Sequence, residues 1–232
     1  MYKWRNSDFP SPVHSLLAYV EKVRSVQWNH LLESTNGTMD VSLITGEDSS
    51  ESSLFLDPEF VRNTSVNGYF NVDATFKVVP KTIGSMQLLT IMSWKYNKTI
   101  FIIWVLMDSK TIEAYTAVFE CIVRLIPEYE IQEVLTDYEN ALKTALRNVF
   151  PNIILHGCWF HYKQALLRKA LQLKLHALLK TNKDAKHLLA LIIALPLLSA
   201  HLIRKTYDEI CHAQSQYIKT KFQSFFQYYE HQ

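Results

Sequence analysis

The sequence predicts a mixed α/β fold, in which a three-strand meander precedes strand–helix units and a helical region follows. The hydrophobic period is two near residue 70, becomes helical after residue 110, and stays helical after residue 160. The 232 residues can bury a sizeable core, and 12% aromatic with 20% charged residues exclude a disordered chain. The chain has five glycines and neither G-x-G-x-x-G nor G-x-x-x-x-G-K-[ST], which argues against Rossmann and P-loop proteins.

The N-terminal part is expected to hold little of the sheet. A short helix is predicted within residues 13–32, where one side is apolar, with Val13, Leu16, Leu17, Val20 and Val23. Residues 34–53 are rich in Ser, Thr, Asp and Glu and lack Lys and Arg, which is typical of an exposed loop or linker. We therefore expect residues 1–66 to be an N-terminal helix and polar linker.

Three strands are predicted next. In Tyr69–Pro80 apolar and polar residues alternate, and Leu88–Trp94 is a second candidate. Ile100–Met107 is apolar on both faces, as expected of a central strand in a covered sheet. The gaps between them are too short for crossover helices, so the strands should form an antiparallel meander.

Helices and strands then alternate. Thr111–Ile126 has helical periodicity, N-cap candidates in Asp108, Ser109 and Thr111, and Pro127 after its end. The following elements are a strand, a helix and a short strand, over Ile131–Thr136, Asn140–Phe150 and Ile153–His156. The order β-β-β-α-β-α-β is that of the ribonuclease-H-like fold, in which the first strand lies centrally beside the fourth. This core is expected over residues 67–161.

The last part of the chain is predicted to be helical and basic. Helices are expected over residues 162–180, 186–195, 197–212 and 215–229. Residues 153–232 carry 11 Lys and Arg against 4 Asp and Glu, whereas residues 1–152 carry 13 against 18. This asymmetry favours a polyanion such as DNA as partner, but basic residues that merely solvate the outer face of the helices explain it equally well.

The predicted topology brings two acids together. Asp73 lies on the polar face of the first strand, and Asp137 ends the fourth strand. Adjacent carboxylates repel unless a cation neutralises them, and Mg²⁺ is commonly held by one or two carboxylates. Two such ions would activate an attacking group and stabilise the leaving oxygen of a phosphodiester. The alternative is two unrelated acids, one of which caps the helix at residue 140.

A second cluster contains Cys158 and His161, at the spacing of half a zinc site. No second Cys and His pair follows at suitable spacing, so we do not expect structural zinc. A buried thiol among core aromatic residues and a nucleophilic Cys–His pair are the alternatives. The chain has three widely spaced cysteines, which favours a reducing compartment, and no signal peptide or membrane-spanning run is evident.

Five segments resemble the transposase domain of Mutator-like elements (MULE) in sequence, order and spacing. They are Asp73-Ala74-Thr75-Phe76, Gln87-Leu88-Leu89-Thr90, Leu106-Met107, Thr136-Asp137-Tyr138-Glu139-Asn140-Ala141 and Gly157-Cys158-Trp159-Phe160-His161. The resemblance is close over residues 66–170. It implies a ribonuclease-H-like DDE recombinase that uses Mg²⁺ or Mn²⁺ to cleave and join DNA. It also implies that Asp73 and Asp137 are the first two metal-binding acids and that Cys158 and His161 form the family's C-x-x-H motif.

The third acid of the family does not appear in its usual setting. That acid is a Glu in an Arg-Thr-Asn-Asn-like context after a helical insertion, and neither Glu209 nor Glu230 has this context. The sequence therefore resembles an incomplete transposase and leaves its activity as an enzyme open. The main alternative is a non-catalytic, transposon-derived module that binds DNA or protein. A ribonuclease-H-like exonuclease ranks last, because Asp73-Ala74-Thr75 lacks the Glu of an Asp-x-Glu motif.

The resemblance also implies DNA as the partner and a location in the nucleus. Lys163, Arg168 and Lys169, in the basic helical region, are the candidates for DNA contact. No membrane association is expected. The sequence leaves the oligomeric state open, a homo-oligomer included.

Overall fold

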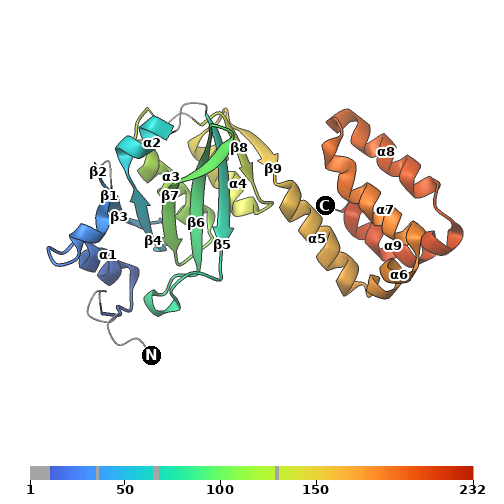
Figure 1. The fold of residues 1–232 in the computed structure, drawn as a ribbon, viewed down its shortest axis with the longest axis horizontal. Coiled ribbons are helices and arrows are strands. Elements are labelled where there is room, and N and C mark those ends of the chain that lie inside the picture. The colour runs from blue at the N-terminus through green and yellow to red at the C-terminus, as the bar shows by residue number, and fades with distance from the viewer. Residues whose placement is uncertain (1–10, 35–36, 65–67, 129–130, 232) are drawn as a thin grey trace. The chain divides into compact units, whose positions relative to one another are not determined.

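A computed structural model describes residues 11–34, 37–64, 68–128 and 131–231 (Figure 1). The chain divides into two compact units, Met1–His156 and Gly157–Gln232. Residues 1–10, 35–36 and 65–66 of the predicted N-terminal helix and linker, and residue 67 of the predicted core, lie outside the described residues. The first unit contains the sheet, and the described residues of the second form helices and their connections.

Among the described residues of the first unit, seven strands form one mixed sheet in the order β3-β4-β7-β6-β5-β8-β9. The strands are β3 (Asp40–Thr45), β4 (Glu51–Leu56), β5 (Tyr69–Thr75), β6 (Gln87–Lys95), β7 (Lys98–Met107), β8 (Glu133–Thr136) and β9 (Ile154–Gly157). A separate antiparallel pair joins β1 (Glu33–Ser34) to β2 (Gly37–Thr38). Short 3-10 turns lie at η2 (Asn29–Leu32), η3 (Lys81–Ile83) and η4 (Leu195–Leu197).

The predicted topology is confirmed. β5, β6 and β7 are consecutive antiparallel neighbours, as a meander requires. β8 pairs in parallel with β5 on the side away from β6, and β9 lies beyond β8. The first strand of the meander therefore lies centrally beside the fourth predicted strand, in a ribonuclease-H-like arrangement.

The prediction of an exposed loop over residues 34–53 is wrong. β3 and β4 are antiparallel partners, and β4 also pairs with β7, so this segment extends the sheet by two strands. Ser52 and Ser53, read as loop residues because they are polar, are 2% and 0% exposed. Pairing with β7 satisfies the backbone groups of β4, so small polar side chains are accommodated in a buried strand.

Two helices cover one face of the sheet and close its main core. These are α3 (Ile112–Leu125) and α4 (Asn140–Val149), whose buried apolar side chains cluster with those of β4 to β8. Thr111 is the N-cap of α3, because its Oγ1 accepts a hydrogen bond from the backbone N–H of Ala114 at 3.2 Å. Pro58–Thr64 forms a further helix, α2, that the sequence analysis did not predict.

The opposite face of the sheet is covered at one end by α1 (Leu16–Arg24). Leu16 clusters with Ile83 and Leu106. Leu106 lies between Val105 and Met107 of the main core, and successive side chains of a strand point to opposite faces. On this second face, several side chains of β5, β6 and β8 remain partly exposed.

The second unit is an assembly of helices around its own core. They are α5 (Trp159–Gln172), α6 (His176–Thr181), α7 (Lys183–Ala194), α8 (Ala200–His212) and α9 (Gln216–Glu230). The continuous helix predicted over residues 162–180 is broken between α5 and α6, where Lys174 adopts a left-handed conformation with φ 58°. The core is built around Tyr207, Phe222 and Phe225, which are at most 2% exposed. No helix among the described residues combines the length and hydrophobicity that crossing a membrane requires.

Candidate active site

The sheet brings the strand of Asp73 beside the strand that leads to Asp137. Val72 of β5 and Thr136 of β8 are partners in the parallel register. Asp73 is the next residue of β5, and Asp137 is the residue directly after β8. Neighbouring strands lie about 4.8 Å apart, so the two acids start from adjacent backbone positions. Asp73 follows Val72 of the main core, so it belongs to the opposite face of the sheet, whereas Asp137 directly follows the end of β8.

Local hydrogen bonds fix the backbone around Asp73. Its Oδ1 accepts from the backbone N–H of Ala74 at 3.0 Å. Its backbone carbonyl accepts from Oγ1 of Thr90 on β6 at 3.2 Å. The residue is therefore tied to the neighbouring strand, and its carboxylate lies at the carboxyl end of β5.

Asp137 also has a structural role. Its Oδ1 accepts from the backbone N–H of Glu139 at 3.0 Å, in the turn that leads into α4. This bond lies just before the helix: the N-cap residue of α4 is Glu139, which makes no side-chain capping bond, so the structure does not show Asp137 as the cap of the helix at residue 140. The contact is compatible with metal binding. A carboxylate has two oxygens with four acceptor positions, so one such bond leaves capacity for a cation.

A buried polar pair that the sequence analysis did not find supports this turn. Nε2 of Gln87, on β6, donates to the hydroxyl of Tyr115, on α3, at 2.8 Å, and both side chains are fully buried. Tyr115 in turn forms a hydrogen bond with Glu139. Burial raises the pKa of Tyr115, so its hydroxyl stays protonated and donates to that carboxylate. The feature of the sequence that could have indicated this pair is a Gln next to the apolar residues of a predicted strand.

Glu139 is the third carboxyl group of this corner. Burial raises the pKa of the Glu139 carboxyl, and the negative charge of Asp137 raises it further. Lys110 and the hydrogen bond from Tyr115 oppose that increase. The Nζ atom of Lys110 lies 3.8 Å from the centroid of the Phe76 ring, just beyond the end of β5. Glu139 is thus within electrostatic reach of Asp137 and of the cationic side chain of Lys110.

The donor set fits a hard cation. Asp73 and Asp137 supply carboxylate oxygens, which are the ligands that Mg²⁺ and Mn²⁺ prefer. No group of three His, Cys, Asp or Glu side chains arranged to hold a metal occurs in the part of the chain that the structure describes. Mg²⁺ needs no such cage, since it usually binds one or two carboxylates and completes its shell with water and phosphate oxygens.

Cys158 and His161 lie at the start of α5, in the second unit. Cys158 is the N-cap residue and is partly buried, and the His161 ring makes an edge-to-face contact with Phe160 at 5.5 Å. Within the described residues, neither belongs to a group of three potential metal ligands. These contacts locate Cys158 and His161 at the start of α5, and the chemical role of the pair stays a prediction.

Residues 69–165 match the family model described as the MULE transposase domain. The chain contains a MULE transposase domain. The matched range begins with the first residue of β5 and ends within α5, so it includes Asp73, Asp137, Cys158 and His161. No curated protein is similar enough to the chain to count as a match.

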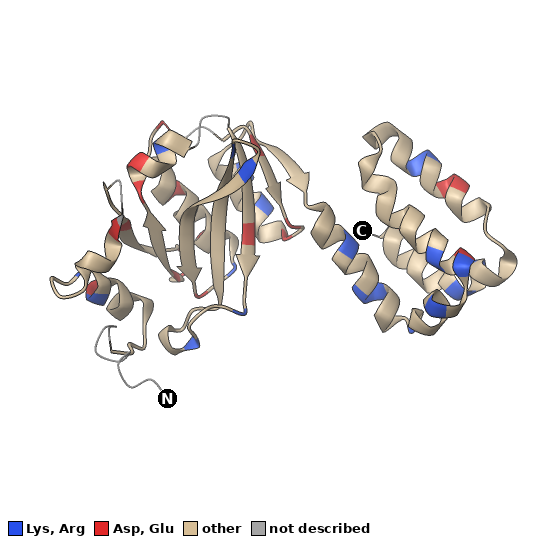
Figure 2. Cartoon of the chain, in the orientation of Figure 1, with Lys and Arg blue, Asp and Glu red and all other residues tan. Residues whose placement is uncertain are grey.

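The matched range ends within α5, a basic helix of the second unit. Figure 2 shows Lys and Arg along α5, where the three predicted DNA-contacting residues lie. Lys163 lies over the Trp159 ring at 5.3 Å, and Lys169 over the Tyr228 ring at 4.7 Å. At 3.6 residues per turn, Lys163, Arg168 and Lys169 are about 100° or more apart around the helix. The structure therefore does not bring these three charges onto one face.

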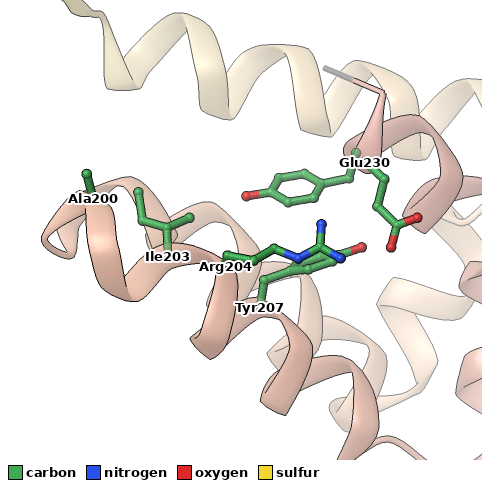
Figure 3. Close-up of a pocket in the computed structure, with 6 residues that line it drawn as sticks. Ala200, Ile203, Arg204, Tyr207 and Glu230 are labelled. Carbon is green, nitrogen blue, oxygen red and sulfur yellow. The ribbon is translucent and has the colours of Figure 1, made fainter.

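The two glutamates weighed as replacements for the third acid both lie in the helical unit. Glu209, on α8, is 3.9 Å from Nζ of Lys205 in an exposed ion pair. Glu230, at the end of α9, lines a hollow with Arg204 and Tyr207 (Figure 3). Their immediate contacts are thus with other side chains of this unit.

We expect Glu139→Gln to increase the free energy of unfolding of the metal-free protein at about pH 7 and to have less effect at about pH 4. Because the pKa of Glu139 is raised in the folded protein, its contribution to stability is present at low pH and is lost as the pH rises through the folded pKa. Gln cannot ionise and removes that loss. Urea denaturation at the two pH values measures the effect. Glu113→Gln, an exposed change in the first turn of α3, is the control and should not stabilise the protein.

Proposed function

We propose that this MULE transposase domain is a DDE-type catalytic core for Mg²⁺-dependent cleavage and strand transfer of DNA. The observation that carries the proposal is the pairing of β5 with β8, in which Val72 and Thr136, the residues directly before Asp73 and Asp137, are partners. The family match over residues 69–165 supports DNA as the substrate. A nuclear location and a homo-oligomeric state stay predictions.

Each residue of the corner has a chemical task in this proposal. Asp73 and Asp137 hold Mg²⁺ or Mn²⁺ through carboxylate oxygens. Such ions activate the attacking oxygen of a phosphodiester reaction and neutralise charge on the leaving oxygen. Gln87 and Tyr115 position the turn of residues 137–139 through the hydrogen bond to Glu139. Lys110 offsets part of the negative charge before the substrate binds.

Cleavage by the 232-residue polypeptide itself is expected to be weak. Two-metal phosphoryl transfer needs both ions fixed on opposite sides of the scissile phosphate. Asp73 and Asp137 are the two acids that match the family, and no Arg-Thr-Asn-x-x-Glu segment occurs among these 232 residues. Poorly held ions lose much of the benefit of a preorganised site.

Nicking or strand transfer of element-end DNA with Mg²⁺ or Mn²⁺ tests this expectation of weak cleavage, with Asp137→Ala as the control. Strong wild-type activity that Asp137→Ala abolishes would mean that another acid, such as Glu209 or Glu230, completes the site, and equal activity in both would indicate a contaminating nuclease.

A second candidate function is DNA binding without catalysis. It is favoured by the basic composition of residues 153–232. The two functions differ in their dependence on Asp73 and Asp137. Catalysis requires both carboxylates, whereas binding through Lys and Arg does not.

We expect the protein to bind duplex DNA with little sequence preference and with an affinity that falls steeply as salt rises. Counterion release makes log K fall by about 0.9 per neutralised phosphate for each unit of log salt concentration. Because Lys163, Arg168 and Lys169 lie on different sides of α5, we expect their alanine variants to reduce this slope unequally. Fluorescence anisotropy between about 50 and 200 mM salt measures it.

Lys98→Ala is the matched control, because Lys98 is an exposed lysine on β7 in the acidic unit. It should leave the affinity and the salt slope close to those of the wild type. An affinity that does not change with salt, or that is insensitive to all three α5 substitutions, would contradict the proposed role of this helix.

A further inference from the structure

The face of the sheet that carries Asp73 also carries a hollow at the other end of the same strands. Tyr69, Asn71 and Asp73 alternate along β5 and share one face. A cavity of about 250 Å³ opens on this face. It is lined by Tyr69, Phe70, Asn71, Trp94, Glu133, Leu135 and His156. These residues come from β5, β6, β8 and β9 and lie within the first unit.

The strand register arranges these side chains in rows across the sheet. Tyr69 pairs with Glu133 of β8. On its other side, the antiparallel register pairs Phe70 with Ser93 of β6, so Tyr69 and Trp94 are the next positions across from one another. Asn71 pairs with Leu135 in the following row. Asp73 begins the row after that, four residues from Tyr69, which is about 13 Å at 3.3 Å per residue. The hollow and the acids are thus separate sites on one continuous surface.

The lining combines aromatic faces with polar edges. Tyr69 and Trp94 are 48% and 47% exposed, so each offers part of its ring to a ligand. Nε2 of His156 lies 2.7 Å from Oε2 of Glu133, and this pair forms one polar side of the hollow. Asn71 adds an amide that can both donate and accept. An entirely apolar occupant would leave these polar groups without partners, so the lining favours a flat ring with a polar edge.

We propose that this hollow binds an unpaired nucleobase of the DNA strand whose phosphate lies at Asp73 and Asp137, an inference that rests on the proposed function. The base stacks on Tyr69 and Trp94, as bases do on aromatic side chains in single-strand-binding proteins. Its edge faces Asn71, Glu133 and His156. Because Glu133 is an acceptor, the hollow selects bases that carry an exocyclic amino group, which are cytosine, adenine and guanine, over thymine. Stacking and edge contacts do not depend on the charge of the phosphates, so they suit a hollow in this acidic unit.

The test uses the 232-residue protein and three probes of one sequence. They are a blunt duplex, the same duplex with a short cytosine overhang, and the same duplex with a short thymine overhang. We expect the cytosine overhang to bind more tightly than the thymine overhang and the blunt duplex. Trp94→Ala should weaken binding of the cytosine overhang about tenfold and change binding of the blunt duplex less than about twofold. Glu133→Gln should bring the affinities of the two overhangs together.

Phe101→Ala is the matched control, since Phe101 is a half-exposed aromatic residue of the neighbouring strand β7 that does not line the hollow. It should retain the overhang preference, and each variant is checked by thermal unfolding. Equal loss on all probes with Trp94→Ala, or the same loss with Phe101→Ala, would overturn the proposal. Shielding of Trp94 from a fluorescence quencher in the free protein would also overturn the proposal, because a protein segment would then occupy the hollow.

The experiment separates the base pocket from the proposed function. Asp73→Asn should weaken Mn²⁺ binding at least about tenfold and keep the overhang preference, because the acid lies two rows away from the aromatic pair. Absence of metal binding in the wild type would contradict the proposed catalysis, while an overhang preference that depends on Trp94 would still support the pocket. Metal binding without any overhang preference would contradict the pocket alone.

Discussion

Replacing Asp137 with Asn is expected to weaken Mn²⁺ binding at least about tenfold, and Asp73→Asn should do the same. Even substitutions in the second shell of a metal site typically cost about 10–100-fold in affinity, and these two carboxylates are the direct ligands in the proposed site. Each Asn keeps the size of the side chain but removes its negative charge. A titration followed by electron paramagnetic resonance of free Mn²⁺ measures the affinity, and competition with Mg²⁺ gives the corresponding Mg²⁺ value.

Asp40→Asn is the control for this experiment, because Asp40 is an exposed acid on β3, at the other edge of the sheet. Its affinity for Mn²⁺ should equal that of the wild type. If Asp73→Asn and Asp137→Asn both bound Mn²⁺ normally, the two acids would not form the metal site. In that case the hydrogen bond from Glu139 N–H to Asp137 would remain as a purely structural contact.

The second large effect is expected from Phe119→Ala, which should lower the free energy of unfolding of the first unit by about 3–5 kcal/mol. Phe119 is fully buried on α3 and packs against the Phe150 ring, with 6.2 Å between ring centroids. The substitution leaves a cavity between the sheet and the helix that holds Tyr115. Since domains are typically stable by about 5–15 kcal/mol, the loss is a large fraction of the total. Urea denaturation followed by circular dichroism measures it.

Phe101→Ala serves as the comparison here as well, because half of the Phe101 side chain is exposed. Its effect should stay below about 1 kcal/mol, since substitutions near the surface usually have small effects. A similar loss for the two variants would mean that α3 contributes little to the stability of the sheet.

The sequence by itself determined the order and type of the central elements. Alternation in Tyr69–Thr75 specified a strand with one polar face, and the helical period of Ile112–Leu125 specified an amphipathic helix. These patterns are local, so they are readable without knowing what packs against them. Short gaps then required the meander. The position of Asp73 beside the strand of Asp137 followed from the topology.

Tertiary structure alone decided which polar residues are buried. Ser52 and Ser53 look like loop residues in sequence, and only pairing with β7, about fifty residues later in the chain, makes them part of the sheet. The bond from Gln87 to Tyr115 joins residues 28 apart, and the row of Trp94, Tyr69 and Glu133 draws on three strands. Such contacts depend on register and packing between distant segments. Side-chain periodicity reports only which face of its own element a residue occupies, and it does not identify the partner on that face.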